Sequence, residues 1–87
     1  MTYDIEFEPS AGRAIRKLPP HARRLVEGVL AILADEPRPP AARRLVNSPE
    51  WRVRVGDYRV IYLIDDGRLV VVVVVRAGHR REVYRGR

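Results

Sequence analysis

The chain has 87 residues, a formal net charge of +6 and no cysteine. Such a chain forms one small domain, and without thiols it has neither a disulfide framework nor a cysteine-ligated metal site. The first residues lack the basic-then-apolar pattern of a signal peptide. The longest apolar run, residues 69–75, is far shorter than the roughly 20 residues that span a bilayer. We therefore expect a single domain over residues 1–87, located in the cytoplasm and without a membrane partner.

The first half of the sequence predicts one strand and two helices, which are separated by clear breaks. Residues 2–7 alternate between polar and apolar types and predict a strand. Ser10 is a candidate N-cap for a helix that ends at Pro19-Pro20, where a second helix begins. A proline-rich connection, residues 37–49, follows. The second helix should pack on a sheet through an apolar stripe, which consists of Ala22, Leu25, Val26, Val29, Leu30 and Leu33.

Three strands are predicted after residue 50. Gly56-Asp57 and Asp66-Gly67 are typical of tight hairpin turns, so the strands should form an antiparallel meander. We predict an α+β fold, in which an N-terminal strand and a helical hairpin precede this three-stranded antiparallel meander. The strands form one small sheet, and the two helices cover one of its faces.

Two-residue loops at both turns would fix the register of the meander. Arg54 then lies opposite Arg59, Val74 also lies opposite Arg59, and Arg76 lies opposite Asp57. Because cross-strand partners share a face, the face toward the helices carries Trp51, Val53, Val55, Tyr58, Val60, Tyr62, Val73 and Val75. The other face carries Arg52, Arg54, Arg59 and Arg76 at one end and an uncovered apolar strip at the other, made of Ile61, Leu63, Val70 and Val72.

The grouped arginines favour a phosphate ligand. A solvated sheet face would explain any single arginine, but like charges directly opposed across strands cost roughly 0.2–1 kcal/mol. A bound phosphate backbone would replace that repulsion with charge-assisted hydrogen bonds. Residues 76–87 add five arginines against one glutamate, and focused positive charge favours nucleic acid or an acidic partner.

Two other side chains adjoin this cluster. His79 precedes two arginines and titrates near neutrality, so it can move protons. Tyr84 among guanidinium groups would favour its phenolate form and could act as a base. The two histidines are far apart and the acidic residues are scattered, so no metal motif is present and no cofactor is expected.

The two C-terminal motifs, WRVRVGDYRVIY at 51–62 and GHRREVY at 78–84, resemble the RelE branch of the RelE/ParE toxin superfamily. The likeness covers nearly the whole chain, including the helical hairpin with Arg16-Lys17-Leu18-Pro19. It implies a RelE-like fold and an endoribonuclease (an mRNA interferase) that cleaves ribosome-bound mRNA without a metal and is silenced by a cognate antitoxin.

The resemblance also implies roles for individual residues. Arg59 matches the arginine that holds the scissile phosphate. Either Arg80 or Arg81 matches a C-terminal arginine that stabilises the transition state or leaving group, and Tyr84 matches the tyrosine that orients or activates the 2′-hydroxyl. Substrate contacts are expected from the basic positions Arg52 and Arg54, and from Arg76 and His79, which adjoin the cluster.

Two other functions fit the same chain. The ParE branch of the superfamily poisons DNA gyrase and lacks the assembled catalytic site, so the arginines and Tyr84 argue against it. A nucleic-acid-binding module without catalysis would also use a basic sheet face.

Overall fold

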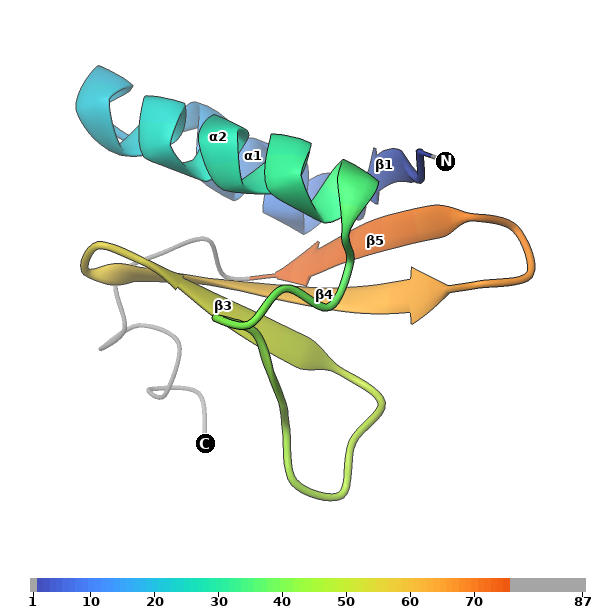
Figure 1. Cartoon of the computed structure of the whole chain (residues 1–87). Coiled ribbons are helices and arrows are strands. Elements are labelled where there is room, and N and C mark those ends of the chain that lie inside the picture. The colour runs from blue at the N-terminus through green and yellow to red at the C-terminus, as the bar shows by residue number, and fades with distance from the viewer. Residues whose placement is uncertain (1, 76–87) are drawn as a thin grey trace.

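The structure, a computed structural model, describes residues 2–75. In chain order it contains β1 (Asp4–Phe7), α1 (Pro9–Arg16), α2 (Pro20–Asp35), β2 (Arg43–Arg44), β3 (Trp51–Val55), β4 (Tyr58–Asp65) and β5 (Val70–Val75). The strands form one five-stranded sheet in the order β1-β5-β4-β3-β2. Both helices lie on one face of this sheet (Figure 1). The predicted α+β architecture is confirmed.

Prolines begin both helices. Pro9 and Pro20 occupy first-turn positions, where the missing N–H costs no hydrogen bond and the fixed φ suits the helix. The N-cap position of α1 is Glu8, whose side chain makes no cap hydrogen bond, so the expectation that Ser10 caps this helix is wrong. Proline at N1 sets the boundary two residues earlier.

The core lies between α2 and the inner face of the sheet. Residues spaced three or four apart along α2 are buried, namely Ala22, Val26, Leu30 and Leu33. Val26, Leu30 and Leu33 belong to one apolar cluster with strand residues that alternate in sequence, and alternate residues of a strand share a face. The strand members are Val53, Val55, Val60, Tyr62, Val71 and Val73. Leu25, which was expected in the stripe, is 42% exposed because it lies at the margin of the buried face.

Two strand pairings extend the sheet beyond the predicted meander. β1 runs parallel to β5, and β2 pairs antiparallel with β3. β5 is therefore an interior strand. Ile61 and Val70 are 2% and 4% exposed, whereas Leu63 and Val72 are half-buried. The expectation of an uncovered apolar strip is therefore wrong for its two ends, Ile61 and Val70.

The first hairpin has the predicted register and the second does not. Val55 pairs with Tyr58 across Gly56-Asp57, and Arg54 lies opposite Arg59. The second turn has four residues rather than two, because Asp65 pairs with Val70. A register shift at Ile61/Tyr62 then pairs Ile61 with Val75. The predicted pairing of Val74 with Arg59 is therefore wrong.

Two glycines offer a matched test of these backbone assignments. Gly56 has a φ of +61° at the first central position of the tight turn, as a type II′ hairpin requires. Gly28 lies inside α2, and a methyl group there would meet no atom within 4 Å. Gly56→Ala should lower the free energy of unfolding by about 1 kcal/mol or more, whereas Gly28→Ala should raise it by roughly 0.5–1 kcal/mol. Urea unfolding measures both values, and a stabilising Gly56→Ala would contradict the left-handed turn.

Candidate functional site

The sheet face that points away from the helices carries the predicted arginine cluster. Arg54 of β3 lies directly opposite Arg59 of β4. Arg52 lies two residues from Arg54 on β3 and therefore on the same face. The structure thus brings together the three described arginines that the sequence assigned to the site.

The three guanidinium side chains differ in burial. Arg54 is exposed, Arg52 is half-buried, and Arg59 is only 6% exposed. A cation with so little exposure keeps its position better than a long side chain in solvent, since it has fewer rotamers to lose on binding. Among these three cations, Arg59 is therefore the most fixed and Arg54 is the most accessible.

A small notch lies at the β3–β4 turn, next to this pair. Its volume is about 30 Å³, and its lining residues are Arg54, Gly56, Asp57, Tyr58 and Arg59. That space accommodates a group about the size of one water molecule. A ligand larger than this at the turn would therefore lie on the surface and contact the guanidinium groups from outside.

The edge strand β2 adds a basic residue that the sequence did not assign to the site. Arg43 lies directly opposite Arg52, and Arg44 lies opposite Trp51. Arg43 therefore shares the arginine face, whereas Arg44 belongs to the face that carries the helices. The sequence contained one signal for this strand pair, because the turn-forming residues Asn47-Ser48-Pro49 lie between Arg43-Arg44 and the basic strand β3. The sequence predicted only a short ordered turn there, because two residues are too few to show alternation.

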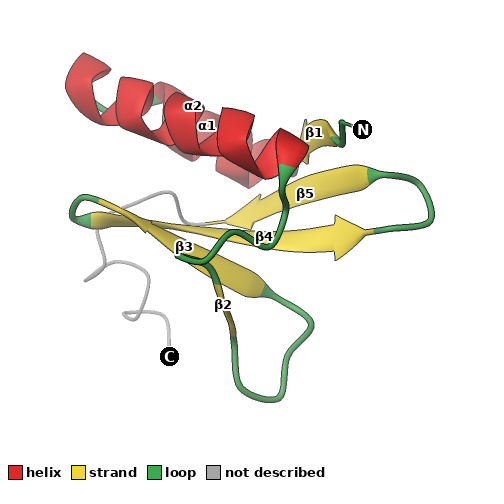
Figure 2. Ribbon diagram, in the orientation of Figure 1, coloured by secondary structure: helices red, strands yellow, loops and turns green. Residues whose placement is uncertain are grey.

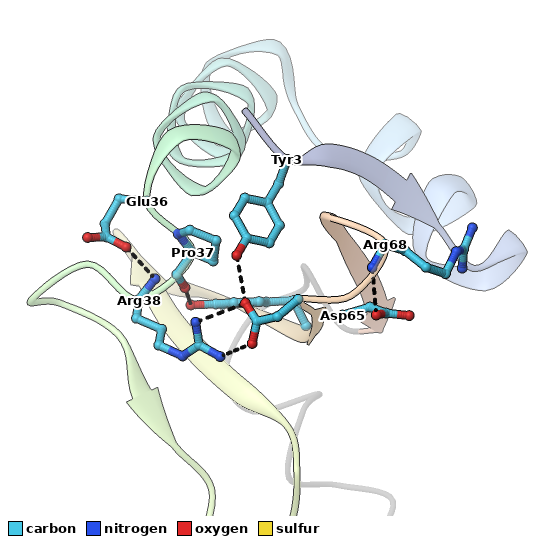
Figure 3. A network of polar contacts seen from close by, with 8 residues as sticks. Tyr3, Glu36, Pro37, Arg38, Asp65 and Arg68 are labelled. Carbon is cyan, nitrogen blue, oxygen red and sulfur yellow. Dashed lines mark hydrogen bonds and ion pairs between the residues drawn. The ribbon is translucent and has the colours of Figure 1, made fainter. Parts of the chain in front are cut away.

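The connection that leads to β2 is anchored at its beginning. The buried hydroxyl of Tyr62 donates a hydrogen bond to the carbonyl oxygen of Pro37 at 2.7 Å. The guanidinium of Arg38 forms a two-point ion pair with Asp66, whose shorter N–O distance is 2.8 Å, and its central carbon lies 5.7 Å from the ring centre of Trp51. Tyr3 donates to the same carboxylate (Figure 3).

These contacts change the proton affinities of their partners. Hydrogen bonds from Arg38 and Tyr3 lower the pKa of Asp66 below its ordinary value. The hydrogen bond to the Asp66 carboxylate raises the pKa of Tyr3. Burial raises the pKa of Tyr62 to about 12. Asp66 is therefore ionised and the two tyrosines are neutral near pH 7, which is the set of protonation states that the ion pair and the tyrosine donors require.

The remaining predicted site residues cannot be placed on this surface. Arg76, His79, Arg80, Arg81 and Tyr84 lie outside the described residues, so their roles stay predictions. Within residues 2–75 there is no group of three or more histidine, aspartate or glutamate side chains that could hold a metal ion. No helix in that part of the chain has both the length and the apolar character to span a membrane.

Known proteins are similar to this chain in both sequence and fold. A family model described as the ParE toxin of type II toxin-antitoxin systems, parDE, matches residues 5–84. Toxin RelG of Mycobacterium tuberculosis (strain ATCC 25618 / H37Rv) is 36% identical over 89 residues, which cover 98% of this chain and 99% of that protein.

Solved structures of RelE toxins superpose well on the chain. The isolated RelE toxin of E. coli matches with a TM-score of 0.79 and 25% identity, covering 97% of this chain and 93% of its own. The toxin in the archaeal RelE-RelB complex from Pyrococcus horikoshii OT3 matches with a TM-score of 0.78 and 28% identity, covering 87% and 93%. A chain of the RelBE2 toxin-antitoxin complex of M. tuberculosis matches with a TM-score of 0.76 and 31% identity, covering 92% and 100%.

Two helices on one face of a small five-stranded sheet are therefore the architecture of a RelE toxin. The chain belongs to the ParE toxin family of type II toxin-antitoxin systems, within the RelE/ParE superfamily. It is the toxin component of such a system.

Proposed function

We propose that the protein is a ribosome-dependent endoribonuclease that cleaves mRNA in the cytoplasm and is held inactive by a cognate antitoxin. The observation that carries the proposal is the directly opposed pair Arg54 and Arg59, with Arg52 on the same face. Opposed cations are unfavourable in the free fold, and a phosphodiester relieves their repulsion. The similarity to RelE toxins and to Toxin RelG supports the same conclusion.

The proposed reaction is an internal transesterification of RNA. The 2′-hydroxyl loses its proton, and its oxygen attacks the adjacent phosphorus. The bond from phosphorus to the 5′-oxygen breaks, and that oxygen takes up a proton. The products are a 2′,3′-cyclic phosphate and a free 5′-hydroxyl. DNA lacks the attacking hydroxyl and cannot react in this way.

Each predicted residue has a distinct task in this scheme. Arg59 holds the scissile phosphate, whose negative charge increases in the transition state. Arg52 and Arg54 bind the flanking RNA backbone. Tyr84 orients or deprotonates the 2′-hydroxyl, and Arg80 or Arg81 stabilises the leaving oxygen. Arg76 and His79 supply further RNA contacts.

The ribosome has a physical role in this proposal. The notch at the β3–β4 turn of the arginine face has a volume of about 30 Å³, and so small a space does little to orient a flexible RNA strand. Holding a strand in a reactive geometry is worth several orders of magnitude in rate. An mRNA already fixed on the ribosome would need only phosphate contacts and proton transfer from the toxin.

Primer extension on a translated mRNA, with and without ribosomes, tests the proposal. We expect new 5′ ends only when ribosomes are present. Cleavage of free RNA at the same rate would remove the ribosome from the mechanism. Absence of cleavage combined with inhibition of DNA gyrase supercoiling would assign the protein to the gyrase-poisoning branch, and absence of both activities would favour a binding module.

Tyr84→Phe tests the proton transfer separately from RNA binding, because the substitution removes a single hydroxyl. General acid–base catalysis contributes roughly 10²–10⁴-fold, so the single-turnover rate on ribosome-bound mRNA should fall by about that factor. The wild-type products should carry 2′,3′-cyclic phosphate ends. Such ends resist ligation, and they become ligatable only after an enzyme opens the ring and removes the phosphate. A wild-type rate for the phenylalanine variant would exclude the tyrosine hydroxyl from the reaction.

A further inference from the structure

We propose that Arg43 and Arg52 form a second phosphate-binding site, one strand away from the Arg54–Arg59 pair, that holds the backbone of the RNA outside the position of cleavage. The inference rests on the proposed function, since it takes the ligand of the arginine face to be single-stranded RNA. It adds β2, an element that the sequence did not assign to the site.

The first observation is a repeated pairing. Arg43 lies directly opposite Arg52 on β2 and β3, just as Arg54 lies opposite Arg59 on β3 and β4. Both pairs lie on the face that points away from the helices, because the neighbouring Val53 and Val55 belong to the core. One pair of opposed like charges is unfavourable because the charges repel each other. The second pair, on adjoining strands of the same face, adds a further repulsion that a bound phosphate would relieve.

The second observation is that nearby carboxylates do not neutralise this pair. Among residues 2–75 the ion pairs of arginine join Arg38 to Asp66 and Arg68 to Glu6. Neither Arg43 nor Arg52 forms one in that part of the chain. The positive charge of the pair is therefore available to an external anion.

The third observation is that Arg43 is positioned and still has donors to spare. Its Nη1 donates to the carbonyl oxygens of Pro40 and Ala42 at 2.6 and 2.8 Å. A guanidinium has five N–H donors, so three remain, and the residue is exposed. The anchored connection from Pro37 and Arg38 leads directly into this segment, so the donors are presented from an ordered edge strand.

The two pairs are spaced for more than one phosphate. Arg52 and Arg54 are two residues apart on β3, or about 7 Å, and neighbouring strands lie about 5 Å apart. A path from Arg59 across Arg54 and Arg52 to Arg43 therefore crosses three strands. A backbone that follows this path extends beyond the scissile phosphate toward the loop between β2 and β3 (Figure 2).

Charged residues on an edge strand also prevent unwanted strand pairing, and Arg44 separates the two explanations. It is adjacent to Arg43 and carries the same charge, but it lies opposite Trp51 on the other face. Protection of the edge would need both arginines equally, whereas a phosphate site on the arginine face needs only Arg43. Arg44→Gln is therefore the matched control for Arg43→Gln.

The experiment measures binding of the full chain to a fluorescent 2′-O-methyl RNA oligonucleotide, which cannot undergo attack by the 2′-oxygen. Affinity is followed by anisotropy over a range of KCl concentrations. Each phosphate contact contributes about 0.7 to the slope of log K against log salt for single strands. Arg43→Gln should reduce the slope by about that amount and weaken binding by about tenfold at the lowest salt. Arg44→Gln should leave the slope unchanged.

Two further variants address folding and the shared ligand. Arg43→Lys keeps the charge and should keep the slope, whereas a purely structural role of the guanidinium in the loop would be lost in both the lysine and glutamine variants. If Arg43 and Arg52 contact the same phosphate, the double variant Arg43→Gln/Arg52→Gln should lose less affinity than the sum of the single variants. Thermal unfolding of each variant confirms that a folded protein is being compared.

An unchanged slope for Arg43→Gln would overturn the second site, as would an equal loss for Arg44→Gln, additive losses in the double variant, or no binding of the oligonucleotide by the wild type. These outcomes are independent of cleavage. A wild-type protein that cleaves ribosome-bound mRNA but shows no Arg43 effect keeps the proposed function and loses the second site. A wild-type protein with the Arg43 effect but without cleavage keeps the site and loses the proposed catalysis.

Discussion

Arg59→Ala should reduce ribosome-dependent mRNA cleavage by about 10²–10³-fold, the range found when one preorganised donor to a developing negative charge is removed. Arg59 is the buried member of the opposed pair, so its charge acts in a less polar environment than that of an exposed arginine. The measurement is the single-turnover rate of cleavage on a programmed ribosome, with the loss of cell toxicity as a second readout.

The burial of Arg59 changes the design of this experiment. With 6% of its surface exposed, truncation to alanine removes packed atoms as well as charge, so an unaltered fold cannot be assumed. Arg59→Lys keeps the charge and much of the stem but loses the planar donor fork, and it should restore only part of the rate. Thermal unfolding and antitoxin binding then separate a folding defect from a catalytic one.

Arg68→Ala is the matched control on the same hairpin. Arg68 lies in the turn after β4, is exposed, and pairs with Glu6 at 3.5 Å, so its removal should change neither cleavage nor stability by a measurable amount. Equal rate losses for Arg68→Ala and Arg59→Ala would mean that overall charge matters, and the assignment of the scissile phosphate to Arg59 would be wrong.

The opposed arginine pair could be predicted because it depends on one local signal. Gly56-Asp57 specifies a two-residue turn through a glycine with positive φ, and alternation then fixes which side chains face each other. The second turn contained a similar Asp66-Gly67 signal, yet it closes with four residues, and Leu69 adopts a φ of +57°. Leucine rarely adopts this conformation, so no local preference pointed to the longer turn.

Non-local pairing explains most of what the sequence did not reveal. The parallel contact of β1 with β5 joins residues that are 66 positions apart in the sequence, and β2 has only two residues. Neither strand has a periodic pattern that specifies its neighbour. Arg43 reaches the arginine face, and β5 becomes an interior strand, only through these pairings. The burial of Arg59 was unexpected for the same reason, since the exposure of a cation depends on the complete fold.

The largest effect on stability should come from Leu30→Ala in α2. Leu30 is 7% exposed and belongs to the apolar cluster between α2 and the inner face of the sheet. Truncation of a buried leucine removes hydrophobic contacts and leaves a cavity, so the free energy of unfolding should fall by roughly 2–5 kcal/mol. For a domain of this size, that loss is a large part of the total stability.

Ile32→Ala is the control, because it deletes a side chain of similar size from the same helix. Ile32 is 54% exposed, and surface substitutions usually change stability by less than about 0.5 kcal/mol. Alanine also has a higher helix propensity than isoleucine, which offsets part of any loss. Urea unfolding of both variants should therefore show a large loss for Leu30→Ala alone. Equal losses would contradict the orientation of α2. The arginine face could then no longer be assigned as the face opposite the helices, since that assignment places Leu30, Val53 and Val60 in one apolar cluster.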